Sequence, residues 1–230
     1  GGYQREQPKD KITLVHDALL MGLQDYFGKL GLKKAILGLS GGIDSAVTAV
    51  MATRALGAEN VRVVLMPSSF SSTHSVEDAK ALAENLGVRY DIIPIASPYD
   101  AFLSLLAPVM EGKPFDVTEE NIQARCRAII LMAISNKHGN ILLNTTNKSE
   151  MAVGYGTMYG DLAGGLSVLA DIYKTEIYQL ADYINKDGEV IPQNSITKPP
   201  SAELRPGQKD SDSLPEYHIL DPILYMYIER

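Results

Sequence analysis

Apolar residues recur along the chain in two patterns that predict alternating helices and strands. Apolar side chains at helical spacing predict a leading helix over residues 11–30, which ends at Gly31. Short apolar runs without that spacing predict four buried strands, at residues 35–39, 61–66, 90–95 and 140–144. Further helices are predicted at residues 44–56, 75–87, 98–110, 118–139, 171–186 and 216–230.

The alternation of strands and helices predicts the fold class. Strands separated by helices form a parallel sheet with helices on both faces, so we expect a doubly wound α/β fold. Ser75 is the expected N-cap of its helix. Residues 154–165 hold five glycines, which predicts a loop held against the rest of the domain. Residues 187–215 are rich in Pro, Ser, Asp and Lys, which predicts a long, mobile surface loop.

Composition narrows the class of protein. With 230 residues, 45% hydrophobic and 21% charged, the chain is expected to fold around one main core. A net charge of -7 argues against a nucleic-acid partner. Its apolar stretches are shorter than the ~20 residues that span a bilayer, and no signal sequence opens it, so we expect no membrane partner and a cytoplasmic protein. The opening Gly1-Gly2 indicates that residues 1–10 are a tag scar or linker before a domain at residues 11–230.

The chain has one cysteine, Cys126, inside a predicted helix with apolar residues after it. A single cysteine excludes a disulfide framework and a cysteine-based zinc cluster. We therefore expect Cys126 to be a buried structural thiol rather than a nucleophile.

The stretch LGLSGGIDSA, residues 37–46, joins the first predicted strand to the next helix. Its glycines expose backbone N–H groups at a helix N-terminus, an arrangement that suits phosphate. It matches neither the Walker A nor the GxGxxG pattern. A carboxylate at Asp44 beside a phosphate site is reasonable if Mg²⁺ bridges the two. The alternative is a tight turn in which Asp44 or Ser45 only caps the helix.

SGGIDS resembles the PP-loop of the ATP pyrophosphatase superfamily, whose members cleave ATP between the α- and β-phosphates. The remaining motifs resemble NAD synthetases, in particular the synthetase domain of the glutamine-dependent type: NIQARCR (121–127), LLNTTNKSEMAVGYGTMYGDLAGG (142–165), DIYKTEIY (171–178) and ITKPPSAELRPGQ (196–208). The resemblance implies an adenine nucleotide alpha hydrolase-like fold. It also implies that deamido-NAD, ATP and ammonia give NAD, AMP and pyrophosphate through an adenylated carboxylate, with no redox cofactor.

The resemblance assigns roles to individual residues. It implies ATP binding by Gly38, Ser40, Gly41, Gly42, Asp44, Ser45, Thr145 and Lys174. It implies deamido-NAD binding by Asn121, Arg125, Glu150 and Asp161, and Mg²⁺ binding by Asp44 and Glu150. The implied catalytic residues are Asp44, Glu150, Asp161 and Lys174.

The same residues have simpler interpretations when they are taken without the resemblance. Arg125 could be a charge on a helix surface, Lys174 a solvated residue of an amphipathic helix, and Glu150 a cap for the helix that follows its loop.

The resemblance also implies partners. NAD synthetases are homodimers with deamido-NAD across the interface, and the helices at 11–30 and 98–138 are candidate surfaces. Glutamine-dependent members carry an N-terminal glutaminase domain, which we do not find in these residues, so ammonia is expected to arrive free or from that domain. Two alternatives remain, a GMP synthetase domain and a non-catalytic ATP-binding module. The presence of both Asp44 and Glu150 favours an enzyme over a module that only binds ATP.

Overall fold

The structure is a computed structural model that describes residues 9–230. Its centre is a five-stranded sheet in the order β3-β2-β1-β4-β5, with every neighbouring pair parallel. The strands are β1 Ala35–Gly38, β2 Val61–Leu65, β3 Arg89–Ile92, β4 Ile141–Asn144 and β5 Leu166–Ser167. The predicted parallel α/β sheet is confirmed. Because the chain winds outward from β1 in two directions, the carboxyl ends of β1 and β4 flank a switch point where such sheets bind ligands.

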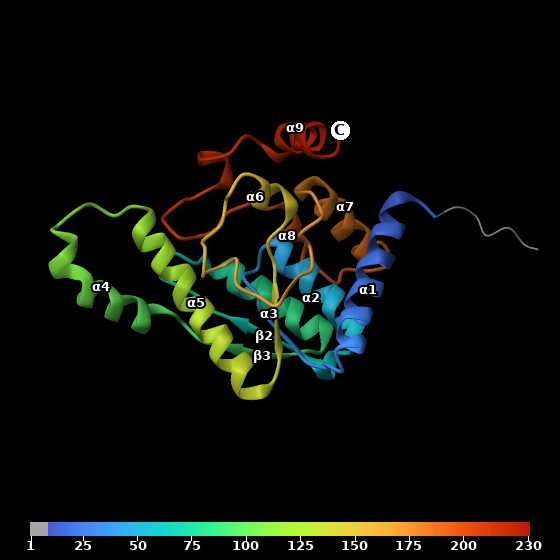
Figure 1. The fold of residues 1–230 in the computed structure, drawn as a ribbon, viewed down its shortest axis with the longest axis horizontal. Helices are drawn as coiled ribbons and strands as arrows, with labels where there is room; N and C mark the ends of the chain where they lie inside the picture. Colours follow the sequence, from blue (N-terminus) through green and yellow to red (C-terminus); the bar gives the residue numbers. More distant parts are fainter. Residues whose placement is uncertain (1–8) are drawn as a thin grey trace, which may run out of the picture.

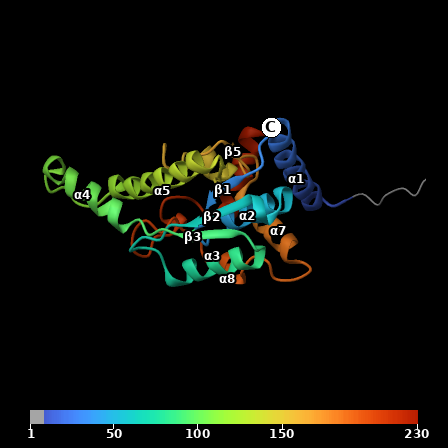
Figure 2. The ribbon, with the colours of Figure 1, turned by 90° about the horizontal axis from the view of Figure 1, so that it is seen from below.

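Helices cover both faces of the sheet (Figures 1 and 2). One face carries α1 Lys11–Lys29, α2 Ile43–Leu56, α3 Thr73–Leu86, α7 Lys174–Asn185 and α8 Gln193–Thr197. The other carries α4 Ala96–Met110 and α5 Val117–His138, which project from the body as a hairpin. The short α6 Lys148–Ala152 and the C-terminal α9 Tyr217–Ile228 lie together beyond the strand ends, where α9 also contacts α7. Two 3-10 segments span Ala58–Asn60 and Asp210–Asp212.

The strands are buried on both faces, which explains why their sequences are continuously apolar. Along β1, Leu37 packs with the α1, α2, α3 and α7 side, whereas its neighbour Ile36 packs with the α4 and α5 side. Cys126 of α5 belongs to this second core at 2% exposure, so the predicted buried thiol is confirmed.

Several predicted boundaries differ from the structure by a few residues. Helix α3 begins at Thr73 with Ser72 as its N-cap, because the Ser72 side chain accepts from the Ser75 N–H and Ser75 lies inside the first turn. The third strand ends at Ile92 rather than at residue 95. Helix α7 begins at Lys174 instead of residue 171.

The segment 187–215, expected as a surface loop, contains α8 and the 3-10 turn Asp210–Asp212. It also buries Ile191, Leu204 and Asp210. Its mobility stays a prediction.

Of the expected scar or linker at residues 1–10, residues 1–8 lie outside the described residues, and Asp10 is the N-cap of α1. Within residues 9–230, no helix is both long enough and apolar enough to cross a membrane.

Candidate active site

A tight turn joins β1 to α2 at the carboxyl edge of the sheet. Gly41 has φ +84°, and a Cβ there would lie 2.2 Å from the backbone oxygen of Ser75, so only glycine fits. The Ser45 hydroxyl accepts from the Ser40 N–H at 3.2 Å and donates to the Gly42 carbonyl at 3.1 Å. These bonds hold the N-terminus of α2 open toward the space beyond the strands, where its partial positive charge suits an anion.

Three predicted site residues meet beside this turn. The Lys174 ammonium donates to Asp44 Oδ2 at 2.5 Å and to Glu150 Oε1 at 3.3 Å. The Lys174 side chain is 3% exposed and those of the two acids are below one fifth, so the predicted solvated alternative for Lys174 is wrong. Asp44, Glu150 and Lys174 come from α2, α6 and α7, and the fold thus unites residues from three separate motifs.

The charge balance of this cluster depends on burial. Burial opposes the charge on Lys174, but Asp44 and Glu150 outweigh it and raise the pKa of the ammonium above its usual value. Burial, followed by the neighbouring Asp44, raises the pKa of Glu150 to about 7. One lysine therefore does not fully compensate the charge of the two carboxylates, so a further cation would be favoured at this site.

Asn147 links the turn to α6 and was missed by the sequence reasoning. Its Nδ2 donates to Asp44 Oδ1 at 2.9 Å, and its Oδ1 accepts from the Glu150 N–H at 2.9 Å. Asn147 is thus the N-cap of α6, the role that the simpler interpretation gave to Glu150. Since both ends of one amide are used, it fixes Asp44 relative to Glu150.

A buried carboxylate of α9 holds together the elements that carry Glu150 and Lys174. Asp221, at 4% exposure, accepts from the Ser149 hydroxyl at 2.6 Å and from the Thr175 N–H at 2.8 Å. The Ser149 hydroxyl in turn accepts from the Lys174 N–H at 2.8 Å. Asp221 therefore joins the starts of α6 and α7, which carry Glu150 and Lys174.

We expect Asp221→Asn to lower the free energy of unfolding by about 2 kcal/mol, since asparagine replaces one acceptor oxygen with an NH₂ group that faces a donor. Urea denaturation would measure the loss. Asp187→Asn, at an exposed site, is the matched control and should change stability by less than about 0.5 kcal/mol. Equal midpoints for both variants would show that Asp221 does not support the site.

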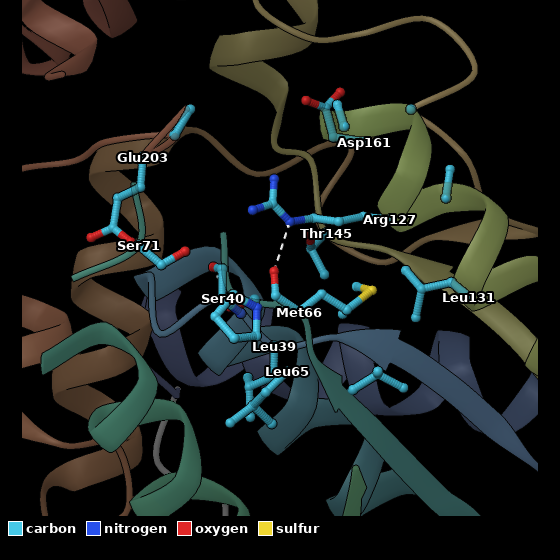
Figure 3. A pocket seen from close by; sticks show the side chains of 18 of the residues that line it. Leu39, Ser40, Leu65, Met66, Ser71, Arg127, Leu131, Thr145, Asp161 and Glu203 are labelled. Carbon is cyan, nitrogen blue, oxygen red and sulfur yellow. Dashed lines mark hydrogen bonds between the residues drawn. The ribbon is translucent and has the colours of Figure 1, made fainter. Parts of the chain in front are cut away.

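Two adjoining cavities open beyond the strand ends. A polar cavity of about 190 Å³ is lined by Asp44, Glu150 and Lys174. An apolar cavity of about 240 Å³ lies between the ends of β1 and β2 and helix α5. Both are lined by Ser40, Ser45, Thr145, Asp161 and Glu203. Gly38 lines the apolar cavity, Gly42 the polar one, and Figure 3 shows Ser40 and Thr145 beside the ends of the strands.

The structure separates two predicted deamido-NAD residues from these cavities. Asn121 Oδ1 accepts from the Thr157 hydroxyl at 2.7 Å, and Arg125 Nε donates to the Met158 carbonyl at 3.3 Å. Both residues therefore hold the glycine-rich segment 154–165 against α5, as that segment's composition predicted. Asp161, in the same segment, does reach the rim of both cavities.

The segment after α8 passes along the cavities and was not singled out for chemistry. Lys198 Nζ donates to the Ser75 hydroxyl at 2.8 Å. The Glu203 carboxylate accepts from Ser75 Oγ at 2.7 Å and Ser72 Oγ at 3.1 Å, which ties this segment to the start of α3. The Gln123 side chain donates to the Leu204 carbonyl at 2.8 Å and ties it to α5.

The sequence reasoning also missed Arg127, which lines the apolar cavity. Its Nε donates to the Met66 carbonyl at the end of β2, at 3.0 Å. Arg127 lies two positions beyond Arg125, on a different face of α5, and only the packing of that helix reveals which face meets the cavity.

A glycine turn after the first strand, two carboxylates with a shared buried lysine, and cavities beyond the strand ends define a nucleotide-binding α/β protein of the PP-loop ATPase class. Residues 15–230 match the sequence model of NAD synthase, and the chain belongs to this family. The chain is 53% identical over 215 residues to a glutamine-dependent NAD(+) synthetase of Thermotoga maritima, covering 93% of this chain and 37% of that protein.

Two solved structures share the fold. A glutamine-dependent NAD+ synthetase from Acinetobacter baumannii, in complex with ADP, matches with TM-score 0.83 and 44% identity over 98% of this chain and 40% of that one. An NMN synthetase from Francisella tularensis matches with TM-score 0.84 and 30% identity over 94% of this chain and 87% of that one. The chain spans about two fifths of the length of the curated relatives that it matches.

Proposed function

We propose that this chain amidates deamido-NAD to NAD, with ATP cleaved to AMP and pyrophosphate. The observation that carries the proposal is the Lys174 ammonium held between Asp44 and Glu150 beside the glycine turn, in a member of the NAD synthase family. A polyphosphate on the turn would meet the helix N-terminus, the lysine and the carboxylates together. The Acinetobacter baumannii relative was solved in complex with ADP, which supports nucleotide binding by this chain.

The donor set fits Mg²⁺ as part of the nucleotide substrate. Asp44 and Glu150 would supply carboxylate oxygens, the ligands that Mg²⁺ prefers. Among residues 9–230 no group of three or more His, Cys, Asp or Glu could hold a metal by itself, so phosphate oxygens of the nucleotide would complete the coordination. When bound, the ion neutralises charge that develops on the departing pyrophosphate.

The first step activates a poor acyl donor. A carboxylate oxygen of the nicotinate attacks the α-phosphorus of ATP, and the bond from that phosphorus to the α–β bridging oxygen breaks, with the electron pair leaving on pyrophosphate. Lys174 remains charged at neutral pH and stabilises the phosphate oxygens. The product is an acyl adenylate, whose phosphate is a far better leaving group than oxide.

The second step forms the amide. Ammonia attacks the acyl carbon, the bond from that carbon to the adenylate oxygen breaks, and AMP leaves with the electron pair. Asp161 at the rim of both cavities can accept the proton that the attacking nitrogen loses. Asn121 and Arg125 support this role because they fix the segment that carries Asp161.

The ammonia source lies outside the synthetase site. Because the chain spans about two fifths of its glutamine-dependent relatives, we assign glutamine hydrolysis to a separate glutaminase domain and expect this chain to use free ammonia. Its substrates are cytoplasmic metabolites, and a cytoplasmic location follows.

The chain also forms a homodimer in this proposal, through the projecting α4 and α5 hairpin. Leu105, Val109 and Ile129 on these helices are 72%, 71% and 59% exposed. Exposed apolar side chains on projecting helices are typical of a subunit interface.

We expect Leu105→Glu to convert the dimer to a monomer in sedimentation velocity, because a charge in an apolar interface is left unpaired. Met21→Glu, at an exposed apolar residue of α1, is the control and should leave the dimer intact. A wild-type monomer at all concentrations would contradict the proposed dimer.

The assay that tests the function combines the chain with ATP, Mg²⁺, ammonium and one acceptor, and measures AMP, pyrophosphate and the amide. Equal amounts of AMP, pyrophosphate and NAD are expected with deamido-NAD. Nicotinic acid mononucleotide and xanthosine monophosphate serve as competing acceptors, the first because an NMN synthetase shares the fold. Preferred amidation of either competitor, or ADP and phosphate as products, would overturn the proposal.

A further inference from the structure

The terminal nitrogens of the Arg127 guanidinium enter the apolar cavity without a hydrogen-bond partner among residues 9–230. Its Nε is anchored on the Met66 carbonyl at 3.0 Å, whereas its two terminal nitrogens donate no hydrogen bond to any residue in 9–230. Figure 3 shows these nitrogens turned away from Met66, toward the open space between Asp161 and Glu203. Both acids attract the Arg127 charge from a distance, but neither accepts a hydrogen bond from its terminal nitrogens among residues 9–230.

A cation in such a place implies an anionic ligand. Burial lowers the pKa of Arg127 to about 10, so the side chain remains charged at neutral pH. Asp161 and Glu203 offset part of its charge, but a half-buried guanidinium whose terminal nitrogens donate no hydrogen bond is unfavourable unless a ligand accepts from them. A guanidinium with two free terminal nitrogens matches two oxygens of a phosphate or carboxylate.

The position of Arg127 indicates which anion it meets. The apolar cavity suits a base and ribose, while the polar cavity holds Asp44, Glu150 and Lys174 for the outer phosphates. Arg127 faces Thr145 and Asp161, which line both cavities (Figure 3). The junction of the two cavities is where the α-phosphate of a nucleotide spanning them would lie.

We infer that Arg127 is a catalytic residue of adenylation, whose terminal nitrogens bind oxygens of the α-phosphate as the substrate carboxylate attacks it. The inference rests on the proposed function. In this step the nicotinate carboxylate approaches the negatively charged α-phosphate. A guanidinium beside both groups offsets their repulsion and the charge that grows on the α-phosphate. The Nε bond to Met66 fixes the direction of the side chain before substrate binds.

Pyrophosphate release without ammonium isolates this step. We expect Arg127→Ala to slow the first turnover by about 100-fold, as for removal of one donor to a developing oxyanion. ATP binding measured by calorimetry should weaken by less than about threefold, because the contact strengthens in the transition state. Added guanidinium should restore part of the rate to Arg127→Ala. The rate of Arg127→Lys should lie between those of the wild type and Arg127→Ala, because lysine keeps the charge but cannot donate two parallel hydrogen bonds.

Arg89→Ala is the matched control, since Arg89 lies on β3 with its side chain 67% exposed and should change no rate. Thermal unfolding of each variant checks the fold, and rescue by guanidinium excludes a purely structural role. A wild-type turnover rate in Arg127→Ala, or weaker ATP binding with an unchanged rate, would overturn the inference. If the wild type releases no pyrophosphate with deamido-NAD, the proposed function fails instead.

Discussion

Lys174→Met is expected to slow pyrophosphate release by about 1,000-fold, near the upper end for loss of one preorganised electrostatic contact. Lys174 is the one cation that contacts both Asp44 and Glu150 among the described residues, at 2.5 and 3.3 Å. Methionine keeps most of the volume but leaves two carboxylates facing each other and the incoming phosphates. Repulsion would then oppose nucleotide binding as well as the chemical step.

The same variant should lose about 3 kcal/mol of unfolding free energy, because removal of one partner leaves buried charge uncompensated. Protonation of Glu150 limits the loss, since its pKa is already raised to about 7 by burial and Asp44. Lys11→Met is the control. Lys11 pairs with Glu176 at 2.6 Å while its own side chain is 79% exposed, and removal of an exposed pair changes stability by less than about 1 kcal/mol. Near-wild-type rate and stability for Lys174→Met would contradict the assigned role of the cluster.

Gly41→Ala is expected to abolish measurable ATP binding. The new Cβ would lie 2.2 Å from the Ser75 carbonyl oxygen, which belongs to the backbone of α3 and cannot turn aside. The turn must shift instead, and the N–H groups around Ser40 and Gly42 then no longer point together toward the phosphate site. The left-handed φ of +84° adds a further penalty of about 1–2 kcal/mol for any side chain.

Gly87→Ala separates these two effects. Gly87 ends α3 with φ +64°, and nothing lies within 4 Å of its added Cβ. We expect Gly87→Ala to destabilise the protein by about 1 kcal/mol while ATP still binds normally. Calorimetric titration with ATP and urea unfolding would measure both variants. Normal ATP binding by Gly41→Ala would show that the turn does not hold phosphate.

The sequence predicted the sheet because its strands carry a strong signal. A strand buried on both faces, such as β1, must be apolar throughout, and alternation with helices allows only a parallel arrangement. Strand β5 escaped prediction because Leu166–Ser167 is too short to show a pattern. The cap of α3 was misjudged because Ser72 and Ser75 are equally good candidates locally, and the contact of Ser75 with Glu203 comes from 128 positions away.

The site was predicted only in part, for a related reason. Motif resemblance led to Asp44, Glu150 and Lys174, and folding brought them into one cluster. Helical periodicity gives the spacing between Arg125 and Arg127 but does not say which of them faces the sheet. Likewise, Asp221 looks like an ordinary helix charge until its contacts with Ser149 and Thr175 are known.

In the proposed reaction, the nicotinate carboxylate is adenylated before ammonia attacks. Deamido-NAD labelled with ¹⁸O in that carboxylate tests it most directly, with ATP, Mg²⁺ and ammonium, and mass spectrometry of every product. We expect one ¹⁸O in the phosphate of AMP and one in the amide of NAD, with none in pyrophosphate. Unlabelled AMP formed together with NAD would contradict the account, because the carboxylate oxygen would then have left by another route.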